Sequence, residues 1–169
     1  MPRVEQVAGE LNGAAAGIWN GIPLSCHVAT LIWLHHAQTG ALPAGPLAIP
    51  KLINFRTIIQ QIVARGRPLQ AAWQQVVQVA PGSILVFSDD AGEPGHSCTA
   101  TTDTILIGYN QTGWFRSPGV AADFSIHFTS DIRWLGPPFP TGRVTGQHDR
   151  VYWLTATDGE TAKGVYQNA

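Results

Sequence analysis

The residue that first suggests chemistry is Cys26, because it follows Ser25 at the start of a predicted helix. Ser25 is a suitable N-cap, and Pro23 just before it marks the turn into the helix. The unpaired N–H groups and the dipole of a helix start stabilise a thiolate, which is the nucleophilic form of cysteine. The sequence therefore predicts a nucleophilic Cys26 with a thiol pKa below about 8.5. The alternative is a small buried residue, which is common for free cysteine.

A base for this thiol is available in His96, which follows a glycine-containing loop and begins a predicted strand. An imidazole that acts as a base also needs a third group to hold its tautomer. His127 and His148 are rival candidates for the base. Cys98 lies two residues after His96, so alternation along the strand puts both on one face, where Cys98 could approach Cys26.

The turn after this strand decides which residue faces the His96 ring. If residues 102–104 form a three-residue turn, the register sets Asn110 opposite His96, with its amide beside the ring. If the turn has two residues, Tyr109 faces His96 and Gln111 becomes the diagonal partner. We favour Asn110 as the residue that orients the imidazole, and then Gln111.

The elements that must position these residues follow from the spacing of apolar side chains. A helix is predicted over about 26–38 and is ended by Gly40; its inward stripe would comprise Val28, Leu31, Ile32 and His35. A second helix is predicted over 51–65, with Gly66 as the glycine that ends it. Pro68 would open a third, shorter helix.

The second half of the chain changes in character. A turn at Pro81-Gly82 precedes a series of strands, predicted over 83–87, 96–101, 105–111, 124–128 and 151–155. Helices followed by an antiparallel sheet indicate the α+β class. With 169 residues, a single domain over 1–169 is expected.

Composition excludes several classes of protein. Charged residues are 12% of the chain and the formal net charge is −1, so a nucleic-acid binder held by phosphate contacts is not expected. No apolar run is long enough for a membrane span. The start of the chain is too polar for a signal peptide. Two cysteines cannot form a disulfide framework for this length.

Four features in order resemble the papain-like thiol hydrolases. They are Ser25-Cys26-His27 at a helix start, the turn and strand of 81–87, Gly95-His96-Ser97 at a strand start, and Gly108-Tyr109-Asn110 on the next strand. The segment 81–110 is most similar to the NlpC-type and CHAP-type cell-wall amidases. These have an apolar residue where this chain has Ser97. The resemblance covers about 18–115, and the tail 116–169 has no assigned role.

The resemblance implies a papain-like fold, with N-terminal helices packed on the sheet, and a Cys26-His96-Asn110 mechanism. The backbone N–H of Cys26 would bind the oxyanion. Asn20 stands where the family usually has a glutamine that serves as a second oxyanion donor. Trp114 and Phe115, soon after Asn110, would form a wall beside the substrate. No cofactor and no metal are implied.

This machinery serves several reactions, and the sequence leaves the choice open. The first expectation is a cysteine protease or amidase acting on protein or peptidoglycan; glutamine deamidase and transglutaminase are alternatives. Such short domains resemble toxin domains of secreted bacterial effectors, which implies an inhibitory immunity protein. Such a chain would be cytoplasmic or delivered by a specialised secretion system as part of a longer protein. A non-enzymatic module that binds protein or glycan is the rival from another class.

Overall fold

The structure is a computed structural model that describes residues 3–10, 18–19, 22–23, 25–41, 50–69, 79–102, 105–108, 125–127, 143–145 and 151–169. Its helical elements are α1 (Val4–Glu10), α2 (Cys26–Thr39), the 3₁₀ helix η2 (Pro50–Asn54), α3 (Phe55–Arg65) and α5 (Gly159–Asn168). Its strands are β1 (Ile18–Trp19), β2 (Ile22–Pro23), β3 (Arg67–Pro68), β4 (Ile84–Ser88), β5 (Pro94–Ala100), β6 (Ile105–Ile107), β7 (Ser125–His127), β8 (Arg143–Thr145) and β9 (Val151–Thr157).

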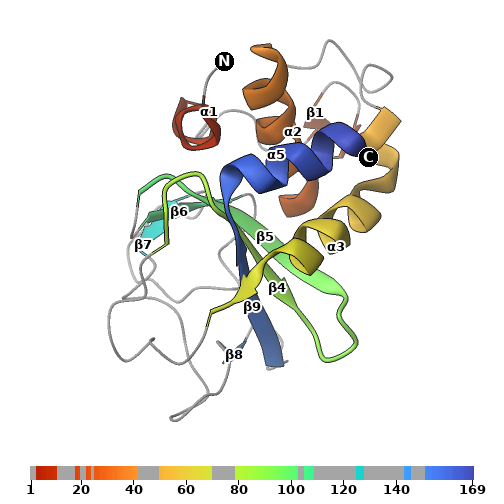
Figure 1. Ribbon diagram of the computed structural model, residues 1–169, viewed down its shortest axis with the longest axis vertical. Helices are drawn as coiled ribbons and strands as arrows, with labels where there is room; N and C mark the ends of the chain where they lie inside the picture. Colours follow the sequence, from red (N-terminus) through yellow and green to blue (C-terminus); the bar gives the residue numbers. More distant parts are fainter. Residues whose placement is uncertain are drawn as a thin grey trace.

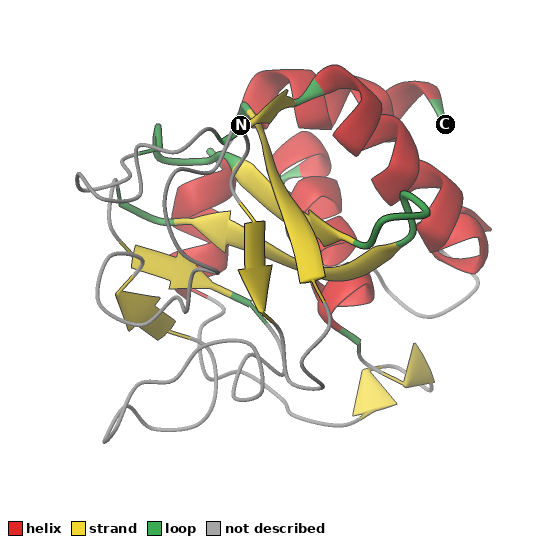
Figure 2. Cartoon of the chain, turned by 90° about the horizontal axis from the view of Figure 1, so that it is seen from below, coloured by secondary structure: helices red, strands yellow, loops and turns green. Residues whose placement is uncertain are grey.

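The larger sheet has the strand order β3-β9-β4-β5-β6-β7, and β8 also pairs with β9. Every strand pair in it is antiparallel. The helices α1, α2, α3 and α5 lie together on one side of this sheet (Figure 1), and a view turned by 90° shows the strands in front of them (Figure 2). The predicted α+β class, with helices packed on an antiparallel sheet, is confirmed.

The helix α2 occupies the centre of the helical layer. Its predicted start at Cys26 is confirmed, and the Ser25 side chain accepts a hydrogen bond from the Val28 N–H at 3.3 Å. Gly40 ends the helix in the left-handed conformation, with φ of 76°, as a C-cap glycine does. The expected inward stripe was too narrow, because α2 is buried from His27 through Leu34, on all sides of the helix. Contacts with α1, α3, α5 and β5 account for this burial.

The end of α3 differs from its prediction. Gly66 is extended, with φ of −83°, so it does not end the helix in the left-handed conformation. A glycine is required there for another reason: a Cβ would lie 2.5 Å from both Cγ2 of Thr155 and Oγ1 of Thr157. The predicted helix start at Pro68 is also wrong, because Pro68 belongs to β3 and pairs with Thr155 of β9. The remainder of that predicted helix, residues 70–78, lies outside the described residues.

The sheet is buried on both faces in its centre. The core on the helical side includes Ile84 and Val86 of β4. On the opposite face, side chains such as Leu85, Phe87 and Leu154 are also at most 1% exposed. The strand β4 is apolar from Ile84 to Phe87, as is typical of a strand that is covered on both faces.

The tail that had no assigned role contributes to the centre of the fold. Strand β9 lies between β3 and β4, with Ile84 opposite Thr157. Thr157 also donates its hydroxyl hydrogen to the carbonyl oxygen of Ile62 at 2.8 Å, which fixes β9 to α3. Helix α5 follows directly and contacts α2 and α3. Asp158 is its N-cap, accepting from the Thr161 N–H at 2.9 Å.

The hairpin of β5 and β6 has the register predicted from a three-residue turn. Thr99 pairs with Ile107, and Ala100 pairs with Leu106. The described ladder ends at Ile107. Continued along the same register, it would bring position 110 level with His96, as the sequence analysis predicted.

Candidate functional site

Cys26 lies at the start of α2, and three main-chain N–H groups are near enough to its sulfur to affect the thiol pKa. These groups belong to Ser97 of β5, to His27 and to Cys26 itself, and each lowers the thiol pKa. Burial acts in the opposite direction and is the largest effect, so the pKa of Cys26 is raised above its ordinary value. The expected lowering of the pKa is therefore wrong: the described state holds a protonated thiol in a cradle of N–H groups.

The Ser97 N–H is available to the sulfur because of the hydrogen-bond pattern of β5. The Ala100 N–H donates to the Ser83 carbonyl at 2.9 Å, toward β4. Main-chain groups of an antiparallel strand alternate in direction, so the N–H groups of Thr99 and Ser97 point toward β6. Thr99 is opposite Ile107, which is the last described residue of that ladder. The N–H of Ser97 points to the same side of β5, and it lowers the pKa of the Cys26 thiol.

A buried imidazole holds the start of α2 against β5. His27 is 6% exposed, and its Nε2 lies 3.1 Å from the carbonyl oxygen of Pro94. Because a carbonyl oxygen only accepts, Nε2 carries the proton, and Nδ1 accepts from the Ser97 hydroxyl at 2.9 Å. Burial lowers the pKa of His27 to about 4, with a smaller contribution in that direction from the charge of Arg56. The ring is therefore neutral at pH 7.

The Ser97 hydroxyl also meets the second turn of α2. Its Oγ lies 3.0 Å from Oγ1 of Thr30. Because the Ser97 hydrogen is donated to His27, the Thr30 hydroxyl hydrogen is shared between the Ser97 Oγ and the carbonyl oxygen of Cys26, each at 3.0 Å. Ser97 thus contacts α2 at three places: its hydroxyl meets His27 and Thr30, and its N–H meets the Cys26 sulfur.

His96 lies next to this contact on β5. Since the Ser97 side chain faces α2, strand alternation directs the His96 side chain to the opposite face of the sheet. There its ring is fully buried, and its centroid is 5.8 Å from that of Phe87. The structure therefore brings the Cys26 sulfur close to the peptide bond between His96 and Ser97. The His96 side chain leaves the main chain on the other face of the sheet.

The remaining predicted site residues cannot be placed. Asn110, Gln111, Asn20, Trp114 and Phe115 lie outside the described residues. Their predicted roles in orienting the imidazole, in binding the oxyanion and in lining the substrate site stay predictions.

Two other candidates can be located in part. Cys98 is fully buried, and its pKa is raised well above the ordinary value by burial and by the nearby Cys26. Both cysteines are free thiols. Of the rival bases, His127 pairs with Ile105 of β6, at the end of the hairpin away from His96. His148 lies outside the described residues.

Sequence reasoning did not assign His27 and Ser97 to the site. Ser97 stood out because the cell-wall amidases that the sequence resembles have an apolar residue there, and this departure was the available signal. The polar side chain at this position has a partner, His27, on the facing helix. An apolar residue at position 97 would leave the buried Nδ1 of His27 without its partner, so the serine is explained by the histidine that faces it.

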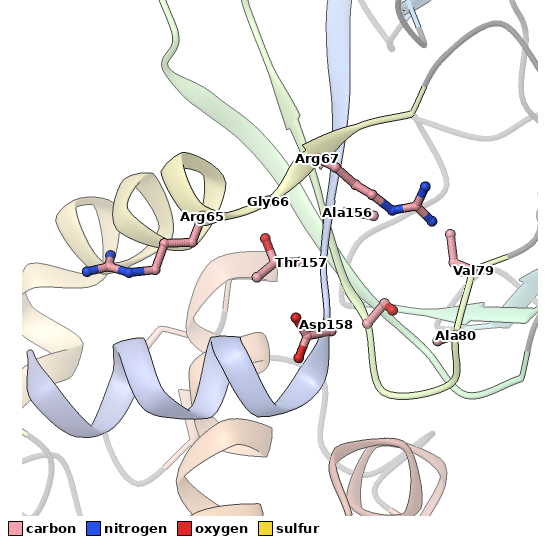
Figure 3. A pocket seen from close by; sticks show the side chains of 9 residues that line it. Arg65, Gly66, Arg67, Val79, Ala80, Ala156, Thr157 and Asp158 are labelled. Carbon is pink, nitrogen blue, oxygen red and sulfur yellow. The ribbon is translucent and has the colours of Figure 1, made fainter.

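No group of three or more His, Cys, Asp or Glu side chains suited to a metal ion occurs in the described part of the chain. Within the same residues, no helix has the length and apolar character needed to cross a membrane. A cleft of about 260 Å³ is formed by the end of α3, by β3 and by the junction of β9 with α5. Figure 3 shows Arg67 and Asp158 at its sides, and its lining includes neither Cys26 nor His96.

Comparisons were made with protein-family models, with curated proteins and with solved structures. None of them gives a match to this chain.

Proposed function

We propose that the protein is a cysteine-dependent amide hydrolase with Cys26 as its nucleophile. The observation that supports this most directly is the position of Cys26 at the capped start of α2, where the N–H groups of Cys26, His27 and Ser97 act to lower its thiol pKa. Such a cradle favours negative charge, whether on a thiolate or on the oxygen of a tetrahedral intermediate beside the sulfur. Two of the groups come from the helix start and one from a separate strand, so the cradle is a product of the tertiary fold.

In the proposed reaction His96 takes the thiol proton while the sulfur attacks the carbonyl carbon of the substrate amide. The carbonyl π bond opens, and the resulting oxyanion is held by the N–H of Cys26, with Asn20 as the second donor. The oxyanion then collapses, the C–N bond breaks, and the amine leaves with the proton from His96. Water hydrolyses the thioester and restores the thiol. Asn110 holds the tautomer of His96 throughout.

His27 is adjacent to Cys26 but is poorly suited to be the base. Both ring nitrogens are engaged, Nδ1 with Ser97 and Nε2 with Pro94. Its pKa of about 4 also makes it a weak proton acceptor near pH 7. The proposal keeps His96 as the base, and it requires the His96 ring to reach the Cys26 sulfur from the other face of the sheet. Because burial raises the Cys26 pKa, the proposed reaction starts from the protonated thiol.

The proposed substrate is an amide bond in protein or peptidoglycan. The same chemistry would allow a glutamine deamidase or a transglutaminase, which differ in the amide chosen or in the acceptor of the acyl group. A secreted bacterial effector or toxin with an inhibitory immunity partner is the biological setting proposed for it. These choices derive from the family resemblance.

The experiment is to incubate the chain with purified peptidoglycan and with a mixed peptide substrate, and to analyse both by mass spectrometry. Hydrolysis of the peptide substrate or of the cross-links of peptidoglycan yields fragments, whereas deamidation adds about one mass unit to an intact target. Cys26→Ala should abolish either product. Cys98→Ala is the matched control, because it removes the other thiol and should leave the product in place.

The rival function is a binding module in which Cys26 is only a buried residue. The raised pKa of Cys26 is the observation that favours it. If neither substrate changes and Cys26 resists alkylation, the hydrolase proposal is contradicted and the binding module is the function that is supported.

A further inference from the structure

We infer that Ser97 is a positioning residue for the Cys26 nucleophile, acting through both its hydroxyl and its main-chain N–H. The inference rests on the proposed function, since it assigns Ser97 a part in that same site. It concerns contacts that the described residues show directly, and it has a readout in the chemistry of the thiol itself.

The hydroxyl fixes where the start of α2 lies. One Ser97 oxygen meets Nδ1 of His27 at 2.9 Å and Oγ1 of Thr30 at 3.0 Å, so it contacts two successive turns of the helix. His27 is held from its other side by the Pro94 carbonyl, and its ring stacks on Phe55 with a centroid distance of 6.0 Å. The imidazole is therefore fixed in position and tautomer, and the helix start is fixed with it.

The main chain of the same residue meets the sulfur. The Ser97 N–H acts on the Cys26 thiol and lowers its pKa, while the Ser97 hydroxyl donates to His27, the residue that follows Cys26. A shift of α2 along β5 would lengthen both contacts at once. One residue thus sets the distance between the nucleophile and the strand that carries His96.

The substitution that tests this is Ser97→Ala. It leaves Nδ1 of His27 buried and without its donor, which favours separation of the helix start from β5. Cys26 then loses burial, the largest influence on its pKa, and the thiol should titrate closer to its ordinary value. We expect alkylation of Cys26 by iodoacetamide at pH 7.5 to become at least about fivefold faster, the factor that corresponds to about 1 kcal/mol.

Two variants provide the controls. Thr99→Val removes a buried hydroxyl from the same face of the same strand, and that hydroxyl has no hydrogen-bond partner among the described residues. It should leave the pH profile of alkylation unchanged. A general loss of stability in β5 would instead change the profile in both Thr99→Val and Ser97→Ala. Ser97→Thr keeps a hydroxyl and should restore the wild-type profile in large part.

A second variant covers the case in which Ser97→Ala does not fold. Thr30→Val removes one of the two contacts made by the Ser97 hydroxyl, together with the bond from Thr30 to the Cys26 carbonyl oxygen, and keeps the shape of the side chain. It should change the alkylation profile in the same direction by a smaller factor. An alkylation profile in Thr30→Val or Ser97→Ala that superimposes on the wild type would overturn the inference.

The alkylation readout separates this inference from the proposed hydrolase activity. If Ser97→Ala changes the alkylation profile and no amide is cleaved by the wild type, the positioning role stands and the hydrolase proposal fails. If the wild type cleaves amides and Ser97→Ala keeps both its kcat and its alkylation profile, the hydrolase stands and the positioning role is wrong. If the hydrolase proposal and the positioning role of Ser97 are both correct, Ser97→Ala is expected to lower kcat more than it raises KM.

Discussion

The Ser97 hydroxyl donates to Nδ1 of His27 at 2.9 Å, which joins the helix that begins at Cys26 to the strand that carries His96. The two partners are separated by 70 positions in the chain. Their bond turns two local features, a cysteine at a helix start and a histidine at a strand start, into one tertiary arrangement.

Cys26 should be the more reactive of the two thiols. Both pKa values are raised, but Cys98 is fully buried and its pKa is raised further, since the nearby Cys26 adds to the effect. Iodoacetamide should therefore label Cys26 first, with a rate that still increases above pH 8.5, because the thiolate fraction is small. Peptide mapping of partially labelled protein measures this. Faster labelling of Cys98 would reverse the assignment of the nucleophile.

Asn110 should matter more to turnover than Gln111. Thr99 pairs with Ile107, and the same register, if it continues along the hairpin, would bring position 110 level with His96. Asn110→Ala should lower kcat on the order of tenfold or more, because a misdirected imidazole is a poorer base. Gln111→Ala is the matched control and should have a smaller effect. A larger loss in Gln111→Ala would show that the strand departs from this register beyond Ile107.

Stability should fall as the pH decreases from about 6.5 to about 4, and His27 should cause much of the change. Its pKa is about 4 in the folded state against 6.5 ordinarily, so in this window the unfolded chain binds the proton and the folded chain does not. The loss between pH 7 and pH 4 is about 3 kcal/mol from this residue. Urea denaturation across the window measures it.

His27→Gln is the variant that tests this origin, and it should flatten the dependence of unfolding free energy on pH. His35 is the control, because its pKa is also lowered by burial and by the charges of His36 and Lys51. His35→Gln should retain the part of the slope that belongs to His27. An equal slope in wild type and His27→Gln would contradict the prediction.

Gly66→Ala should destabilise the fold by about 1–3 kcal/mol, because the added Cβ would lie 2.5 Å from side-chain atoms of Thr155 and Thr157. Gly164→Ala is a matched control in α5, where a Cβ meets nothing within 4 Å. There the substitution should stabilise by about 0.5–1 kcal/mol, since alanine favours the helix. Thermal unfolding of both variants checks the pair, and a Gly66→Ala variant as stable as wild type would contradict the described close approach.

Local signals in the sequence were sufficient to predict the two elements that carry Cys26 and His96. Ser25 and Gly40 define the ends of α2 through bonds within a few residues, and short-range turn geometry set the register of β5 with β6. Such interactions are encoded by neighbouring residues, so they can be inferred without knowledge of the tertiary fold.

Interactions between distant segments account for what was missed. Pro68 suits the first turn of a helix, yet pairing with Thr155 of β9 makes it part of a strand. Gly66 was taken for a helix-ending glycine, whereas the approach of β9 is what excludes a side chain there. His27 acquired its role only through Ser97. In each case the deciding partner lies more than 65 positions away in the chain.

The position of β9 has a consequence for biosynthesis. Because β9 lies between β3 and β4, the ribosome makes both of its neighbours long before β9 itself. During that interval β4, with its apolar residues Ile84 to Phe87, presents one edge without a partner. The nascent chain therefore carries an exposed, aggregation-prone strand until residues 151–157 arrive, and folding of the sheet must be completed after they emerge.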